Sequence, residues 1–312
     1  MKTLIILIFV FLSSFTFAQS NLFNQHVSVK REGQRIFLQG KDCKVLDSEA
    51  MALANWTRSI KEHAPRLSCV CNRGVCKKEI TVTVPDFVEA YQFKHVTTDG
   101  PNCWNATLVA AKIVPQVRYT SDFEMNFWMH SPLCKERKAG EALQPGDIIA
   151  IRNSEHNEVH GFVHISDNLS FSKNGYDKRI PYSLQDPNVV FDTYDVPKNC
   201  RRANGRPKGC SAYAIYYSCM SMEEYLKKNP IKEEVTQAAY KHMQDAECKI
   251  SEAVLSGKGS DELKTLIHAT LDIIGEFAYD TLMTGKYSPE DKVIWQALVH
   301  KSKSLKDQLS LM

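Results

Sequence analysis

Alternating apolar and polar positions fill much of the first two thirds of the chain and predict β-strands there. Residues 26–40 alternate on both sides of Gly33, which is typical of a β-hairpin. A helix is predicted over 46–63, after this hairpin. The further predicted strands cover 78–84, 148–151, 159–166, 169–173, 189–196 and 211–219.

From about Ser221 the apolar positions change to helical spacing. One stripe ends at Gly257, a second ends near Gly285, and Ser288 with Asp291 has the spacing of a capping box before a third helix. The two stripes consist of Val235, Ala239, Met243, Ala246 and Ile250, and of Leu263, Leu266, Ile267, Ile274 and Phe277. We therefore predict three C-terminal helices that bury these stripes against one another or against the β-rich part.

The segment GPNCWNATLVAAKIVP, which starts at Gly100, predicts a short helix with a cysteine in its first turn. Asn102 is a favoured N-cap residue, Cys103 follows it, and Pro115 ends the segment. The apolar face is formed by Leu108, Val109, Ala111 and Ile113. A thiol at a helix N-terminus lies in the positive end of the helix dipole, which predicts a low pKa for Cys103.

Residues 1–18 have the features of a secretory signal peptide, with a lysine, an apolar run and small residues up to Ala18. We expect cleavage near Ala18 and a secreted or periplasmic protein. No later stretch offers ~20 continuous apolar residues, so no integral membrane segment is expected. The net charge is +3, and no basic block is interleaved with aromatic residues, so nucleic acid is not an expected partner.

The chain contains ten cysteines, which predicts disulfides in an exported protein. Cys200 and Cys210 bracket a loop that one disulfide would close. The spacing CVCNRGVC lacks the paired gaps and histidines of a zinc site. Cys103 is either half of a disulfide or a free thiol. If it is free, nine cysteines remain and cannot all pair, and Cys248 is the expected second free thiol.

Candidate bases for a cysteine nucleophile lie around the predicted strand 159–166, since a thiolate mechanism needs a base within hydrogen-bond reach. His160 and His164 share one face of this strand, and His156 lies in the polar loop before it. The two strand histidines are about 13 Å apart along the strand, so they cannot both contact one sulfur. We expect His160, rather than His164, to lie nearest the sulfur of Cys103.

The loop after this strand decides which side chains face His160. If residues 166–168 form a three-residue loop, Ser172 lies diagonally across from His160 on the same face, and Asn174 lies opposite it. A two-residue loop would instead put Lys173 on that face. The three-residue register places an imidazole beside two polar groups, either of which would hold its tautomer.

These motifs, in this order, resemble the NlpC/P60 branch of papain-like thiol hydrolases. The similarity covers about 91–194, and its motifs are the helix-capping cysteine, PGDIIAI at 145–151 and HGFVHISDNLSFS at 160–172. Where that family usually has Asp-Cys-Ser-Gly, this chain reads Asn-Cys-Trp-Asn. The resemblance implies that Cys103 is the nucleophile and His160 the base. Ser172 takes the orienting position, with Asn174 as the alternative.

The resemblance also implies an α+β fold in which an antiparallel sheet packs on the cysteine-bearing helix. The expected organisation is a signal peptide at 1–18, a disulfide-containing α/β region at 19–98, a catalytic core at 99–220 and a helical region at 221–312. The implied activity is that of a cysteine peptidase or amidase. Its substrate would be a peptide or peptidoglycan-type amide, and it would need no metal or organic cofactor. The backbone N–H of Cys103 would donate to the oxyanion, with Tyr91 or Gln92 as a second donor.

Two other functions stay open. A disulfide-rich binding or inhibitor protein on the same scaffold, without catalysis, fits the cysteine count and the weak orienting power of a serine. A transglutaminase-like fold shares the cysteine-helix arrangement but would require an acid near the histidine, for which Asp177 is the nearby candidate.

Overall fold

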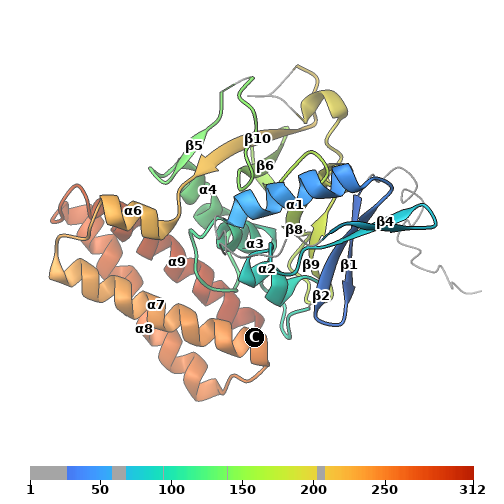
Figure 1. Ribbon diagram of the computed structural model, residues 1–312. Coiled ribbons are helices and arrows are strands. Elements are labelled where there is room, and N and C mark those ends of the chain that lie inside the picture. The colour runs from blue at the N-terminus through green and yellow to red at the C-terminus, as the bar shows by residue number, and fades with distance from the viewer. Residues whose placement is uncertain (1–26, 58–67, 94, 139, 202–207) are drawn as a thin grey trace, which may run out of the picture.

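The computed structural model describes residues 27–57, 68–93, 95–138, 140–201 and 208–312 (Figure 1). They form an α+β protein with two antiparallel sheets, which confirms the predicted class at that level. The predicted signal peptide and the end of the helix predicted at 46–63 lie outside the described residues. Within the described part of the chain, no helix is both long and apolar enough to cross a membrane.

The smaller sheet comes from the N-terminal region and has the strand order β1-β2-β4-β3. The predicted hairpin around Gly33 is confirmed, and this glycine has a φ of 61° in the turn. Helix α1 (Cys43–Thr57) contacts the sheet through β2 and β4. The strands are β1 (Val27–Glu32), β2 (Arg35–Gly40), β3 (Val70–Asn72) and β4 (Val75–Glu79).

The strand predicted at 78–84 is wrong beyond Glu79, where β4 ends. The backbone N–H groups of Thr83 and Val84 both donate to the carbonyl of Ile80, which closes a turn. Ile80 and Val84 are buried on the same side of this turn, so their apolar spacing reports burial rather than a strand. Helix α2 (Asp86–Tyr91) follows directly.

The larger sheet has the strand order β5-β10-β6-β7-β8-β9, and every neighbouring pair is antiparallel. Helix α3 (Cys103–Ala110) packs against β7 and β8, as predicted for the cysteine-bearing helix. The strands are β5 (Cys134–Glu136), β6 (Ile148–Asn153), β7 (Glu158–His164), β8 (Ser170–Lys173), β9 (Tyr182–Gln185) and β10 (Ala212–Cys219).

The turn between β7 and β8 has the predicted three-residue register. Val163 pairs with Phe171, and the ladder closes on residues 166–168. The buried carboxylate of Glu49 in α1 accepts hydrogen bonds from two side chains of this loop, those of Ser166 and Asn168. The N-terminal region therefore holds the hairpin that carries the candidate base.

The strand predicted at 189–196 is wrong, because this segment forms helix α5 (Pro187–Thr193). The side chain of Asp186 caps the helix by accepting from the backbone N–H of Asn188 at 2.8 Å. Pro187 stands at the start of the helix, where its fixed φ is favourable. Cap and proline together outweigh the β-propensity of the apolar residues that follow. A short 3₁₀ helix, Lys198–Cys200, comes after it.

The three predicted C-terminal helices are present, and a fourth, α6, precedes them. Helix α6 begins with a complete capping box between Ser221 and Glu224. The predicted ends at Gly257 and Gly285 are confirmed, and both glycines are left-handed. The helices are α6 (Met222–Lys228), α7 (Glu234–Ser256), α8 (Asp261–Thr284) and α9 (Lys292–Leu311).

The capping box predicted from Ser288 to Asp291 forms in half: the Ser288 hydroxyl accepts from the backbone N–H of Asp291 at 3.2 Å, but the backbone N–H of Ser288 donates to Glu233, and α9 begins only at Lys292. The Asp291 carboxylate accepts instead from the backbone N–H groups of Lys232 and Glu233, at 2.9 and 3.1 Å. This carboxylate therefore fixes the segment before α7. The two segments are far apart in the sequence, so the spacing of residues around Asp291 does not reveal the contact.

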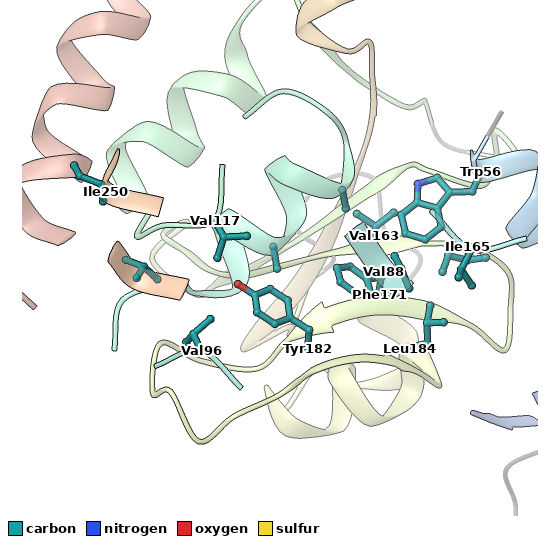
Figure 2. Close-up of a cluster of buried hydrophobic side chains, with 14 of the residues drawn as sticks. Trp56, Val88, Val96, Val117, Val163, Ile165, Phe171, Tyr182, Leu184 and Ile250 are labelled. Atoms are coloured by element: carbon teal, nitrogen blue, oxygen red, sulfur yellow. The ribbon is translucent and has the colours of Figure 1, made fainter. Parts of the chain in front are cut away.

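One hydrophobic cluster joins the regions that the sequence separates. Figure 2 shows Trp56 and Val88 from the N-terminal region, Phe171 and Tyr182 from the larger sheet, and Ile250 from α7 around the same core. The helical region is therefore docked on the rest of the protein, as predicted, rather than attached as a detached tail.

A buried ionic network strengthens this docking. Arg118, on the segment between α3 and α4 (Asp122–His130), pairs with Glu124 at 2.7 Å and with Glu247 of α7 at 2.7 Å. Lys301 of α9 pairs with Glu247 at 2.9 Å, and all four side chains are almost fully buried. Burial would lower the pKa of Arg118, but the two carboxylates raise it above its usual range.

Candidate active site

Cys103 is the first residue of α3, and the cap before it is the predicted one. The side-chain oxygen of Asn102 accepts from the backbone N–H of Asn105 at 3.0 Å. The amide of Asn102 donates to the carbonyl of Thr120 at 2.7 Å, which ties the helix start to the segment before α4. The backbone N–H groups of Cys103 and Trp104, which the cap does not use, hydrogen-bond to the thiol sulfur.

The disulfides leave Cys103 as a thiol. All ten cysteines lie among the described residues, and eight of them form four disulfides, Cys43–Cys69, Cys71–Cys76, Cys134–Cys219 and Cys200–Cys210. Cys103 and Cys248 are free, so of the two alternatives the thiol holds, and Cys248 is the second free thiol expected in that case. Four disulfides are consistent with an oxidising, extracytoplasmic environment.

His160 of β7 is fully buried and has the neighbours that the three-residue register predicted. Its Nε2 lies 3.1 Å from the hydroxyl of Ser172, which donates to Asn174 Oδ1 at 2.7 Å. Because a serine hydroxyl has one proton, Nε2 of His160 must be the donor in the first of these bonds. The other ring nitrogen, Nδ1, is then an acceptor, and it is buried without a hydrogen-bond partner among the described residues. Ser172 therefore orients His160, and Asn174 in turn orients Ser172.

The thiol of Cys103 contacts β7 at Gly161, the residue after His160. The backbone N–H of Gly161 hydrogen-bonds to the sulfur of Cys103. A Cβ at Gly161 would lie 3.1 Å from Met125 and 3.2 Å from Thr107, so a larger residue would push α3 and α4 away from β7 by a few tenths of an ångström. His164 lies at the other end of β7, where its backbone N–H donates to the carbonyl of Asp147.

The expected low pKa of Cys103 is wrong for this closed conformation. Burial raises the pKa of the thiol to about 11, although backbone hydrogen bonds from Gly161, Trp104 and Cys103 itself oppose the shift. Burial also lowers the pKa of His160 to about 3. The thiol and the imidazole are therefore both neutral, and among the described residues no hydrogen bond joins the sulfur of Cys103 to a ring nitrogen of His160. Desolvation of the closed site outweighs the helix dipole on which the expectation rested.

Two residues near the thiol were not assigned a role from the sequence. Tyr194, directly after α5, stacks on His160 with ring centroids 4.0 Å apart and an interplanar angle of 20°. Burial raises the pKa of Tyr194, and the nearby Cys103 raises it further. Lys173 of β8 is fully buried on the strand that carries Ser172. A polar side chain in a buried strand was the available signal for Lys173, whereas Tyr194 lay in the segment misassigned as a strand.

The other sequence candidates lie around β9 and the loop before it. Gln92 is buried, its Oε1 accepts from the backbone N–H of Leu184 at 2.6 Å, and its Nε2 has no partner among the described residues. Tyr91 packs on Tyr182. The carboxylate of Asp177 pairs with Arg179 rather than with His160.

Other features of the described residues stand apart from this thiol. The sulfurs of Cys43, Cys71 and Cys76 lie within 4.8 Å of one another, but they are engaged in disulfides and so offer no thiolates to a metal. A cavity of about 560 Å³ opens at the far end of α3, next to Ala110, Arg137 and Asp147, and does not include Cys103 or His160. His156 hydrogen-bonds to Tyr213 at 2.6 Å in its own loop.

Comparisons with family models, with curated proteins and with solved structures return no match for this chain. The chemistry of the site therefore carries the functional argument.

The neutral state of His160 predicts an acid-dependent loss of stability. Its pKa is depressed on folding, so the unfolded chain binds a proton below about pH 6.5 that the folded protein refuses until about pH 3. The free energy of unfolding should fall as the pH drops through this window, by a term on the order of a few kcal/mol. Urea unfolding from pH 7 to pH 4 measures it. His160→Gln should show a flatter dependence, and an equal slope in both proteins would contradict the assignment.

The stack of Tyr194 on His160 predicts that this ring keeps the thiol unreactive. Tyr194→Ala admits water, so the pKa of Cys103 should fall toward the ordinary thiol value of about 8.5. Alkylation of Cys103 by iodoacetamide at pH 8 should then accelerate ~10- to 100-fold. Tyr194→Phe keeps the ring and should behave as the wild type, and Tyr176→Ala is the control for losing an exposed tyrosine. Equal labelling rates in Tyr194→Ala and wild type would refute the shielding role.

Proposed function

We propose that this chain is an exported cysteine hydrolase of the NlpC/P60-like type, cleaving amide bonds in peptides of the bacterial cell-wall kind. The observation that carries the proposal is the free thiol of Cys103 at a capped helix start, hydrogen-bonded to Gly161 next to His160. The hydrogen-bonded series from His160 to Ser172 and Asn174 supports it, because a base needs a fixed tautomer.

The mechanism follows from the two ring nitrogens of His160. The unpartnered Nδ1 accepts the thiol proton of Cys103, and the resulting thiolate attacks the substrate carbonyl carbon. The tetrahedral oxyanion receives hydrogen bonds from backbone N–H groups at the start of α3. His160 returns the proton to the leaving amine, which departs and leaves a thioester on Cys103. A water molecule, deprotonated by His160, then attacks the thioester, releases the acid and restores the thiol.

Burial limits the access of substrate to Cys103 and His160 in the resting structure. Cys103 is 6 % exposed and His160 is fully buried under the ring of Tyr194, so we infer that this ring moves when substrate binds. Trp104 is the next side chain on α3, and its indole N–H has no partner among the described residues. We assign it as a donor to the bound substrate, in the position where the family usually has serine.

Amine release from purified cell-wall peptide fragments tests the proposed activity. Incubation with the exported full chain should release one new amine for each amide cleaved, and Cys103→Ala should release none. Fragments that stay intact with wild-type protein, in a preparation whose Cys103 is verified as a free thiol, would contradict the hydrolase.

The second candidate is a binding or inhibitor protein without turnover. The observation that favours it is the neutral resting pair, with the pKa of Cys103 raised to about 11 and that of His160 lowered to about 3. Binding of cell-wall fragments that is unchanged in Cys103→Ala, together with no amine release, would support this alternative.

A further inference from the structure

The sulfur of Cys103 accepts from the backbone N–H of Gly161, which lies in the plane of the sheet, so His160 can approach it from one face and the buried Lys173 of β8 from the other. Strand alternation turns Lys173 to the face opposite Ser172, the face of Phe171, and α3 packs on β8. In the register set by Val163 and Phe171, Lys173 is across from Gly161, whose N–H donates to the sulfur of Cys103. Lys173 and Cys103 thus approach the same point of β7.

The ammonium group of Lys173 is held without an ion pair. Its Nζ donates to the carbonyls of Gly175 and Asp177, both at 2.9 Å, and lies 5.9 Å from the centre of the Tyr182 ring. Among the described residues no carboxylate lies within 4.0 Å of it. A buried lysine is rare unless its charge has a partner. The partner expected near Lys173 is therefore a group that is neutral in the resting state and becomes an anion during the reaction.

The thiolate of Cys103 is the anion that fits. The two groups interact electrostatically, with Lys173 lowering the pKa of Cys103 and Cys103 raising that of Lys173. Burial lowers the pKa of Lys173 to about 8, which still leaves most of the group charged at pH 7. His160 is neutral, and the phenols of Tyr119 and Tyr194, which also interact with the sulfur, carry no positive charge. Asp99 and Asp177 act on Lys173 from a distance and favour its charged form.

We propose that Lys173 is the charge partner of Cys103, a positioning residue whose ammonium group stabilises the thiolate from which attack starts. This proposal rests on the proposed function. The thiol proton passes to Nδ1 of His160, the sulfur becomes negative, and Lys173 keeps its three protons throughout. The imidazolium therefore need not persist as the counter-ion of the thiolate.

Two alkylating reagents of different charge test the proposal on the folded full chain without a substrate. Iodoacetate is an anion and iodoacetamide is neutral, so a cation beside the thiol favours iodoacetate, whereas a purely structural change alters both rates together. Lys173→Met should lower the iodoacetate-to-iodoacetamide rate ratio at Cys103 roughly tenfold and shift its labelling profile upward by about one pH unit. Lys178→Met, which removes an exposed lysine two residues after Tyr176, should leave the ratio unchanged.

A second variant guards against a folding defect. Lys173→Gln keeps a donor for the carbonyls of Gly175 and Asp177 but has no charge, so it should show the same fall in the ratio. A ratio and a pH profile equal to those of the wild type in either folded variant would overturn the charge pair. Failure of the hydrolase is separable, because a chain that labels as expected but releases no amine keeps the charge pair and loses only the activity.

Discussion

Cys103→Ala is expected to reduce amide cleavage to the background rate, because no other group near the site replaces the attacking sulfur. His160→Ala should reduce the rate roughly 10²- to 10⁴-fold, the usual contribution of a positioned general base. Both effects follow from one route, in which the unpartnered Nδ1 of His160 takes the thiol proton. The measurement is amine release from the same peptide fragments with each purified variant.

The chain offers a matched control for each replacement. Cys248→Ala removes the other free thiol, which lies on α7 and hydrogen-bonds to Glu252. His164→Ala removes a histidine from the same strand as His160. Both controls should keep near wild-type rates in protein that remains folded. A His164 variant that loses as much activity as the His160 variant would show that the base is misassigned.

Arg118→Met is expected to destabilise the protein by about 3–5 kcal/mol, the second large effect. The guanidinium is fully buried between Glu124 and Glu247, so its removal leaves buried carboxylates without their main partner. Arg118 also donates to Thr120, whose carbonyl holds Asn102 at the start of α3. The helical region and the cysteine helix should therefore loosen together. Urea unfolding of wild type and variant gives the difference in free energy.

Arg179→Met is the matched control for this prediction. Arg179 also forms an ion pair, with Asp177, but its side chain is 84 % exposed. An exposed pair of this kind contributes little, so the variant should change the free energy of unfolding by less than about 1 kcal/mol. If Arg118→Met is no more destabilising than this control, the ionic network does not hold the helical region in place.

Local sequence rules predict the helix cap and limit the strand register. Asn102 before Cys103 is a favoured helix cap, and the sequence leaves two loop lengths after β7, of which the structure has the three-residue loop at 166–168. Both features depend on neighbours in the chain, which is why they are visible without a structure. The free state of Cys103 did not follow from the sequence, because an even number of cysteines can all pair; only the identity of the second free thiol, Cys248, was predicted once Cys103 was taken as free.

The parts that were missed depend on contacts between distant segments. The backbone N–H of Asp291 donates to Ser288 as in a capping box, but its carboxylate accepts from the backbone of the distant Lys232 and Glu233. The apolar pattern at 189–196 predicts a strand that includes Tyr194, whereas the cap at Asp186 starts a helix, and the place of Tyr194 over His160 depends on how α5 docks. The pKa of Cys103 depends on its burial, which is a property of the whole fold and not of the helix start alone.

Acylation of Cys103 by a small activated ester, read by intact mass and peptide mapping, tests the central claim most directly. The assignment of Cys103 as the nucleophile predicts one acyl group per chain, attached to Cys103. Hydroxylamine should release this group, and Cys103→Ala should not acquire it. The proposed mechanism also predicts slower loss of this group in His160→Ala, where no base activates the water. A wild-type protein that is acylated only at lysines, or whose Cys103 maps to a disulfide, would contradict the claim that Cys103 is the nucleophile.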